Sequence, residues 1–567
     1  MMKKDLPLQR HRLYLISVAF MFIATFLGIR LLQKEVIQHP TYRALAKQQQ
    51  FQDRELPGKR GQILVKDGQG KKTYPAATNH TTYALNVVPS QISDKRKVSE
   101  SLSLATDIAP DKIFEQINNT KLYIPPIKRN LSYNEAEKVK NLEFEGVYLT
   151  SEQTRFYPED GVAAQVLGFV NNEGKGQYGI EGYFDEILAP KKGSRQNAQD
   201  AAGDALALGG TDYTPPEDGN NIVLTIDRNI QYHAEQALDA AVKKFSATGG
   251  SVIVMDPKTG AITAMVSRPN FDPNRFGAYP AESYQNQGVS GSYEPGSTFK
   301  TIAMSSALDS GAVTPNTVIN GTASIRVSDR DIYNAERRPY GRQTMTQVIE
   351  HSDNVGMVLT ERALGHQRYY DYIKQFGFGV PTGIQLDGEV SPSLRPIDQY
   401  GEVDFATLSF GQGISVTPIQ LITAMNALAN QGKIMQPYIV DQVQYKDGKV
   451  EATQPKLIRQ VVSPQAASQI TGMMVRVVEA GSGKPAKIPG YRIAGKTGTA
   501  QIAAAGGYEA NTTIGNFVGF APAEDPKFIM LVKIDRPKGV IYAEDSAVPI
   551  FAEVAKYLLS YYNVPPR

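Results

Sequence analysis

Apolar residues form one long, almost uninterrupted stretch near the start of the chain, over residues 13–28. The stretch extends to Leu32 across Arg30, which gives roughly the 17–25 residues that span a bilayer. Basic residues precede it and favour a cytoplasmic N-terminus, namely Lys3, Lys4, Arg10 and Arg12. We therefore predict a cytoplasmic tail over 1–12, a single-pass transmembrane anchor over 13–32 and an extracytoplasmic remainder. A cleaved signal peptide would share this pattern, but the bulky residues 29–34 offer no small-x-small cleavage site.

The pattern after the anchor predicts a non-catalytic α+β module, the pedestal domain, over residues 33–215. Its first part, 33–60, is polar and Gln-rich and is expected to form a helix or stalk. Short β-type runs at 82–88 and 146–149 then alternate with a helical pattern at 133–140. The module ends at a Gly-, Pro- and Asp-rich linker over 209–221.

Residues 216–567 predict one large α/β domain in which helices and strands alternate. It begins with an apolar strand at 222–226 and an amphipathic helix at 229–245. Two β-type runs follow at 251–255 and 261–266, joined by a turn at Asp256-Pro257-Lys258-Thr259-Gly260. Further β-rich stretches are expected at 491–494, 516–520 and 528–534.

Composition excludes several classes of function. The 567 residues are 41% hydrophobic and 21% charged, as in a globular chain with more than one domain. A net charge of +3 gives no reason to expect a nucleic-acid partner. The chain has no Cys, and its six His lack a His-Glu-x-x-His pattern, so we expect neither thiolate catalysis nor a metal or other cofactor.

The first candidate for chemistry is Ser297-Thr298-Phe299-Lys300. Pro295-Gly296 precedes it, and a helical pattern with buried apolar positions runs to Leu308 and ends before Gly311. Ser297 would then begin a helix with Lys300 one turn away on the same face. A lysine can take a proton from a serine hydroxyl only if its pKa is lowered by burial or by a second cation. Taken alone, the motif fits a helix cap followed by a surface lysine better than it fits a catalytic pair.

The second candidate is Ser352-Asp353-Asn354, which precedes a helical run at 355–363. Ser352 would relay a proton to a leaving nitrogen, and Asn354 would hold Lys300 and a substrate amide. Ser132-Tyr133-Asn134 fits the same Ser-x-Asn pattern, but its context predicts a plain helix cap. The tripeptide therefore carries little weight alone.

The third candidate is Lys496-Thr497-Gly498-Thr499, on an expected strand. Gly498 would permit close approach of a substrate backbone, Lys496, Thr497 and Thr499 would bind a terminal carboxylate, and the Thr499 N–H would join an oxyanion hole. The segment 490–497 also matches a P-loop. A P-loop must open a helix, whereas 498–502 has an extended pattern and 503–507 is expected to be a loop, so we reject a nucleotide hydrolase.

In this order, Ser-x-x-Lys, Ser-x-Asn and Lys-Thr-Gly are the signature of penicillin-binding proteins and class A β-lactamases. With its flanking segments the chain resembles the class B, monofunctional penicillin-binding proteins over nearly its whole length. The segments that carry the resemblance are Arg60-Gly61-Gln-Ile63, Arg155-Phe-Tyr157-Pro158, Gln165-Val-Leu-Gly168, Gly179-Ile-Glu181, Phe410-Gly411-Gln412-Gly413 and Thr417-Pro418-Ile-Gln420. After the first of them, Val65-Lys66-Asp67 departs from the family's Asp-Arg.

The resemblance implies a dimerisation-type pedestal and a C-terminal transpeptidase domain with the serine β-lactamase/DD-peptidase-like fold. It implies a peptidoglycan D,D-transpeptidase, with a carboxypeptidase side activity, whose nucleophile Ser297 is also acylated by β-lactams. Implied partners are stem peptides, a membrane glycan polymerase and divisome proteins. The Ser-x-Asn form followed by Val355-Gly356-Met357 resembles the division (septal) type more than the elongation type, which remains the alternative.

Three other functions fit the sequence less well. A membrane-anchored β-lactamase of class A would use a Glu-x-x-x-Asn segment, and none lies between Asn354 and Lys496. A bifunctional polymerase would carry Glu-Asp-x-x-Phe, which is absent from 33–215. A β-lactam sensor would need an output domain that twelve N-terminal residues are not expected to supply.

Overall fold

The computed structural model describes residues 6–42, 51–118, 124–198, 212–504 and 507–567, and the chain divides into two compact units. The first unit comprises Met1–Lys59 and Pro190–Asp218, and the second comprises Arg60–Ala189 and Gly219–Arg567. The second unit thus combines most of the expected pedestal with the expected catalytic domain. The boundary at 215/216 stays a prediction.

In the first unit, α1 (Leu6–Leu32) is followed by a short π-helix, η1 (Gln33–Ile37). The helical segment 11–37 is long and apolar enough to cross a membrane, and none of it is buried. Such a helix fits a single-pass anchor. The helix or stalk expected over 33–60 is only partly correct, because β1 (Phe51–Leu56) pairs with β8 (Gly193–Ala198), which pairs with β9 (Asp212–Thr214).

The centre of the second unit is a five-stranded antiparallel sheet in the order β12-β11-β23-β22-β21. Its strands are β11 (Gly249–Met255), β12 (Ile262–Arg268), β21 (Ala494–Ala504), β22 (Gly507–Ala521) and β23 (Phe528–Asp535). Side chains of a strand alternate between faces, and here both faces are covered. In β11, Val252 and Val254 face one apolar cluster, whereas Ile253 and Met255 face the other. This explains why these strands read as continuous apolar runs.

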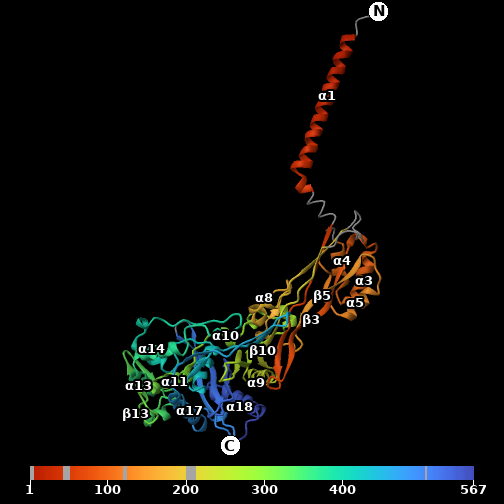
Figure 1. Ribbon diagram of the computed structural model, residues 1–567. Helices are drawn as coiled ribbons and strands as arrows, with labels where there is room; N and C mark the ends of the chain where they lie inside the picture. Colours follow the sequence, from red (N-terminus) through yellow and green to blue (C-terminus); the bar gives the residue numbers. More distant parts are fainter. Residues whose placement is uncertain (1–5, 43–50, 119–123, 199–211, 505–506) are drawn as a thin grey trace, which may run out of the picture. The chain divides into compact units, whose positions relative to one another are not determined.

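Helices form both covering layers. α9 (Arg228–Phe245) and α18 (Ala543–Tyr561) pack together on one side (Figure 1). The other side holds α11 (Lys300–Asp309), α16 (Pro418–Ala429) and α17 (Pro464–Glu479), with η5 (Gly296–Phe299) leading into α11. The remaining helices of this part are short or peripheral and include α12 (Met345–Glu350), α13 (Asn354–Leu364), α14 (His366–Gln375) and α15 (Glu402–Leu408).

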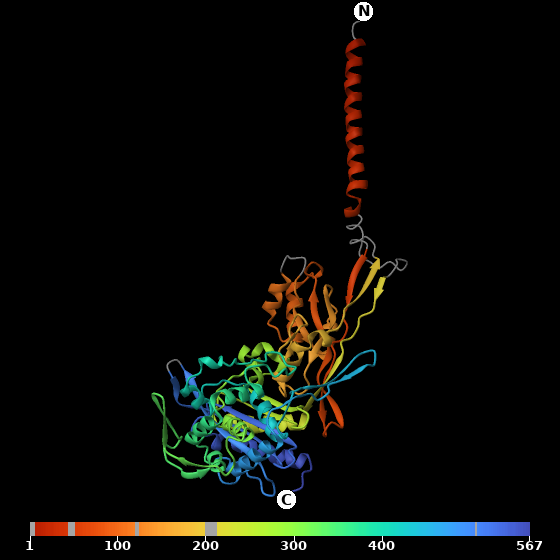
Figure 2. The same cartoon turned by 60° about the vertical axis from the view of Figure 1, so that its left-hand side comes forward.

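Two antiparallel strand pairs precede α12. They are β13 (Val318–Gly321) with β16 (Gly341–Thr344), and β14 (Ser324–Val327) with β15 (Arg330–Tyr333). They form a margin of the second unit in both views (green; Figures 1 and 2).

A seven-stranded sheet contains the expected pedestal strands and also strands from the expected catalytic domain. Its order is β19-β18-β10-β2-β3-β4, with β5 also paired to β3. The strands are β2 (Ile63–Asp67), β3 (Lys72–Val87), β4 (Lys128–Leu131), β5 (Val147–Phe156), β10 (Asn221–Asp227), β18 (Val440–Gln444) and β19 (Val450–Ala452). β10 pairs with β2 in parallel and with β18 in antiparallel fashion. Because β2 pairs with β10, residues 60–189 and 219–567 share this sheet and belong to the same compact unit. A small apolar cluster holds α3 (Lys95–Thr106), α4 (Pro110–Ile117) and α5 (Tyr133–Lys140) beside β3.

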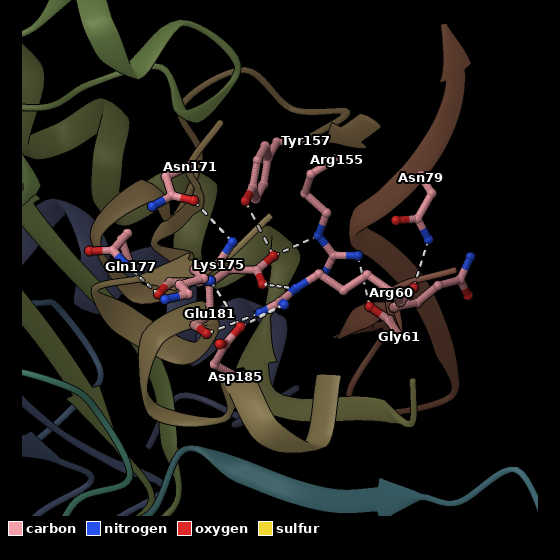
Figure 3. A network of polar contacts seen from close by, with 12 residues as sticks. Arg60, Gly61, Asn79, Arg155, Tyr157, Asn171, Lys175, Gln177, Glu181 and Asp185 are labelled. Atoms are coloured by element: carbon pink, nitrogen blue, oxygen red, sulfur yellow. Dashed lines mark hydrogen bonds and ion pairs between the residues drawn. The ribbon is translucent and has the colours of Figure 1, made fainter. Parts of the chain in front are cut away.

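A buried ion-pair network joins three of the segments that carry the family resemblance (Figure 3). Glu181 is fully buried and accepts from the guanidinium groups of Arg60 and Arg155, each at 2.6 Å. Tyr157 donates its O–H to Glu181 at 3.2 Å, and Arg60 also pairs with Asp185 at 2.7 Å. A buried carboxylate requires such partners, so the network fixes how these segments meet.

The segment that departs from the family pattern also makes structural contacts. Lys66 pairs with Asp441 at 2.7 Å, and Asp67 accepts a hydrogen bond from the Asn229 side chain. Both tie β2 to neighbouring elements.

Two expectations near Lys496 were wrong. The strand begins at Ala494 rather than Tyr491, and residues 503–504 and 507 are not a loop, whereas the expected strand through the Lys-Thr-Gly-Thr motif is confirmed. Ala503 and Ala504 continue the strand and Gly507 already belongs to β22, whereas 505–506 lie outside the described residues. Ala503 and Ala504 belong to the strand because the backbone of each pairs with a residue of β22.

Candidate active site

Ser297 lies in η5, at the point where the chain enters the buried helix α11. Gly296 before it has φ of +58°, and a Cβ there would meet the carbonyl oxygen of Thr499 at 2.8 Å. Its N–H donates to the carbonyl of Gly411 at 3.0 Å. Glycine is therefore required for this segment to lie against β21, and Ser297 is left partly exposed.

Lys300 is completely buried, one helical turn after Ser297. Its Nζ donates to the carbonyl oxygen of Ser352 at 2.6 Å and to Oδ1 of Asn354 at 2.7 Å. It also lies 3.1 Å from the Ser352 Oγ. No hydrogen bond reaches the Ser297 hydroxyl within the described part of the chain, which leaves that hydroxyl available to a substrate.

The Ser352-Asp353-Asn354 turn presents its outer residues to Lys300 because its middle residue anchors the next helix. Asp353 is the N-cap of α13, and its carboxylate accepts from the Gly356 N–H at 2.9 Å. Ser352 adopts a left-handed conformation with φ of +55°. The Asn354 side chain donates to the Tyr333 carbonyl at 2.9 Å. Because the NH2 group of Asn354 makes this bond, its oxygen Oδ1 faces Lys300 and accepts from it.

Lys496 enters the same site from β21 and is also completely buried. Its Nζ lies 3.0 Å from the Ser352 Oγ, so this hydroxyl stands between two lysines. The Thr497 hydroxyl contacts the Ser482 hydroxyl at 2.7 Å. The Thr499 hydroxyl accepts from the Ala543 N–H at 3.0 Å and retains its own proton for another acceptor.

The electrostatics follow from burying two lysines together. Burial, and then the charge of Lys496, hold the pKa of Lys300 well below its usual range, against a smaller opposite effect of Asp353. Burial lowers the pKa of Lys496 to about 7. At neutral pH the pair does not carry two full charges, and a neutral Lys300 can accept the Ser352 proton while Lys496 donates to the same oxygen. This arrangement suits proton transfer to and from a serine hydroxyl.

Two family models match the chain. The penicillin-binding protein dimerisation domain matches residues 55–224, and the penicillin binding protein transpeptidase domain matches residues 250–556. The chain belongs to the class B penicillin-binding proteins.

Named relatives agree with this family over most of their length. Stage V sporulation protein D of Bacillus subtilis is 34% identical, over 98% of this chain and 87% of its own. Peptidoglycan D,D-transpeptidase FtsI of Escherichia coli is 30% identical, over 89% of this chain and 84% of its own.

Solved structures agree as well. Penicillin-binding protein 2X of Streptococcus thermophilus superimposes with a TM-score of 0.74 at 26% identity, covering 90% of this chain and 81% of that one. Penicillin-binding protein 3 of Mycobacterium tuberculosis, solved with aztreonam, gives 0.70 at 27% identity, covering 91% and 98%.

The site of this penicillin-binding protein includes a residue that the sequence did not reveal. Asn516 on β22 is completely buried, and its side-chain amide donates to the carbonyl of Pro295 at 3.0 Å. A Cβ on Gly498 would lie 2.7 Å from that amide nitrogen. Gly498 therefore makes room for Asn516 to hold the segment before Ser297. No sequence pattern signals this contact, because it joins residues 221 positions apart.

Among the described residues, no group of three or more His, Asp or Glu side chains is placed to hold a metal ion. The polar groups that meet at the site are hydroxyls, amides and amines.

Proposed function

We propose that this protein is a peptidoglycan D,D-transpeptidase that cross-links stem peptides through an acyl-serine intermediate in cell-wall synthesis. The observation that carries the proposal is the position of the Ser352 Oγ, 3.1 Å from Lys300 and 3.0 Å from Lys496 beside the Ser297 segment. This arrangement brings together a base (Lys300), a proton relay (Ser352) and a cation (Lys496). The family and its named transpeptidase relatives support the same activity.

In acylation, neutral Lys300 takes the proton of Ser297, whose Oγ adds to the carbonyl carbon of the penultimate D-Ala. The N–H groups of Ser297 and Thr499 stabilise the oxyanion. When the C–N bond breaks, the leaving nitrogen takes the proton of Ser352, which regains one from the Lys300 ammonium. Terminal D-Ala leaves and the acyl group stays on Ser297.

In the second half-reaction, an amine of a neighbouring stem adds to the acyl carbon and gives a proton to Lys300. The ester bond breaks, and the Ser297 oxygen recovers that proton. Attack by water in place of the amine yields the carboxypeptidase side activity.

Substrate binding is assigned to the same strand and turn. Lys496 and the hydroxyls of Thr497 and Thr499 bind the terminal carboxylate, Gly498 lets the peptide backbone approach, and Asn354 holds the substrate amide. A β-lactam presents a carboxylate and a reactive amide in a similar arrangement and therefore acylates Ser297.

The direct test is labelling with a tagged penicillin. We expect a long-lived adduct on Ser297 in the full-length protein and none in Ser297→Ala. Absence of an adduct in the wild type, or equal labelling of Ser297→Ala, would contradict the proposal. Rapid release of the label would indicate a β-lactamase instead.

The cellular role belongs to this proposal too. We assign the tail (1–12) to the cytoplasm, the anchor (13–32) to the cytoplasmic membrane, and the pedestal (33–215) and transpeptidase (216–567) domains to its outer side. Val355-Gly356-Met357 after Ser-x-Asn supports a division role beside a glycan polymerase and divisome proteins. Midcell localisation of a fluorescent fusion is expected, and even labelling of the cell cylinder would favour the elongation type.

A further inference from the structure

Glu294 is an ionisable residue beside the nucleophile that the proposed mechanism does not use. It precedes Ser297 by three residues, on a segment that runs antiparallel to residues 411–416. Tyr293 forms a β-bridge with Val416, and Gly296 bonds to Gly411, so the segment is held on both sides of Glu294. The side chain therefore has a fixed base.

Two donors orient the Glu294 carboxylate. Oε1 accepts from the Gly413 N–H at 2.9 Å, and Oε2 accepts from the Tyr508 O–H at 3.2 Å. Neither donor is cationic, and in the described ranges no Lys, Arg or His forms an ion pair with Glu294. A carboxylate has about four acceptor positions, so about two remain open.

The environment of Glu294 favours a cationic ligand. The carboxylate is only partly exposed, and this burial raises its pKa. Burial deprives the ionised carboxylate of hydration by water. A cation at the open acceptor positions would offset that loss and stabilise the ionised form. Charge-assisted hydrogen bonds of this kind are among the stronger ones in proteins.

Glu294 and Lys496 lie toward opposite ends of β21, so the two ends of the site carry opposite charges. Lys496 lies near the start of β21, whereas Tyr508, the partner of Glu294, pairs with Ala503 near its end. A peptide that lies along β21 with its terminal carboxylate at Lys496 would extend toward Glu294. The site would then match a ligand with a carboxylate at one end and an ammonium group farther along.

We propose that Glu294, held by Gly413 and Tyr508, is a binding residue for the primary ammonium group of a stem-peptide side chain. This inference rests on the proposed transpeptidase function. Stem peptides that cross-link through a side-chain amine supply such a group from two sources. One is the donor peptide that acylates Ser297, and the other is the acceptor whose amine resolves the acyl-enzyme.

The donor source is tested with two thioester peptides that end in a D-Ala mimic and differ only in a free or acetylated side-chain amine. Acetylation removes the charge, so we expect the wild type to be acylated about tenfold faster by the free amine. The acceptor source is tested with an acyl-enzyme formed from an amine-free thioester. Glu294→Gln is then expected to raise the half-saturating acceptor concentration about tenfold.

Glu294→Gln keeps the size of the side chain and one acceptor oxygen for the Gly413 N–H, replaces the other oxygen by an NH2 donor, and removes the charge. We expect its free-to-acetylated rate ratio to fall to about one if the donor is bound. Glu282→Gln, which changes an exposed carboxylate of the same unit, should retain the wild-type ratio. Because the free-to-acetylated rate ratio compares two substrates of the same enzyme, a general loss of reactivity in a variant cancels out. Labelling with penicillin gives the fraction of each preparation that has a reactive Ser297.

The outcomes separate the two proposals. If the wild type is not labelled by penicillin, the transpeptidase function fails. If it is labelled, but Glu294→Gln lowers neither the donor ratio nor the apparent affinity for the acceptor, the Glu294 proposal alone is overturned. Loss of all penicillin labelling in Glu294→Gln would also overturn it, because Glu294 would then serve the fold of the Ser297 segment.

Discussion

The chain contains two Lys-Thr-Gly tripeptides, and they have entirely different surroundings. Lys258-Thr259-Gly260 forms the turn between β11 and β12, where the Lys258 side chain is 61% exposed and pairs with Asp525 at 2.7 Å. Lys496 is completely buried, and burial lowers its pKa to about 7. The same residues thus give a surface ion pair in one place and, in the other, a buried amine that contacts Ser352. Burial and neighbours make the difference.

The two Ser-x-Asn tripeptides differ in the same way. Ser132 is the N-cap of α5 and forms a capping box with Glu135. Ser352 instead adopts φ of +55° and places its hydroxyl between Lys300 and Lys496. One serine stabilises a helix end, and the other links two amines.

The largest contrast is expected between the two lysines. Lys496→Ala should slow acylation by labelled penicillin about 10²–10³-fold, because it removes the cation that meets the carboxylate and the partner of Ser352. Lys258→Ala should stay within about twofold of wild type, since an exposed ion pair contributes little. Second-order rate constants for adduct formation measure both. Similar losses in the two variants would contradict the contrast.

The two serines should separate rate from stability. Ser352→Ala removes the proton relay and should slow acylation about 10²-fold. Ser132→Ala should leave acylation unchanged and lower the free energy of unfolding by about 1 kcal/mol, through loss of the helix cap. Adduct formation and chemical denaturation, applied to both variants, test this. A slow Ser132→Ala enzyme would count against it.

Much of this organisation could be predicted because the signals are local. The apolar run of α1, the cap at Ser132, the turn at Lys258 and the helical turn around Ser297 that leads into α11 each depend on neighbouring residues. Near-continuous apolar runs likewise located β10, β11 and β23, and a period-3.6 pattern located α9.

Contacts between distant segments could not be predicted in this way. Burial of Lys300 and Lys496 requires α11, the turn before α13 and β21 to come together. The Arg60–Glu181 ion pair likewise joins residues 121 positions apart. β1 was missed because its polar sequence forms a strand only beside β8. Asn516 and Glu294 carry no motif at all, and only their contacts with Pro295 and Gly413 reveal them.

The central claim is that burying two lysines beside Ser352 sets the chemistry of Ser297, and the pH dependence of penicillin acylation tests it most directly. Protonation of Lys300, whose pKa is lowered, removes the base, so the rate should fall as pH falls through that pKa. Deprotonation of Lys496, whose pKa is about 7, removes the cation, so the rate should fall as pH rises above it. The account predicts a bell-shaped profile with both limbs below 10.5, the ordinary lysine value. A rate that keeps rising to about pH 10, as an ordinary solvated lysine would give, would contradict it.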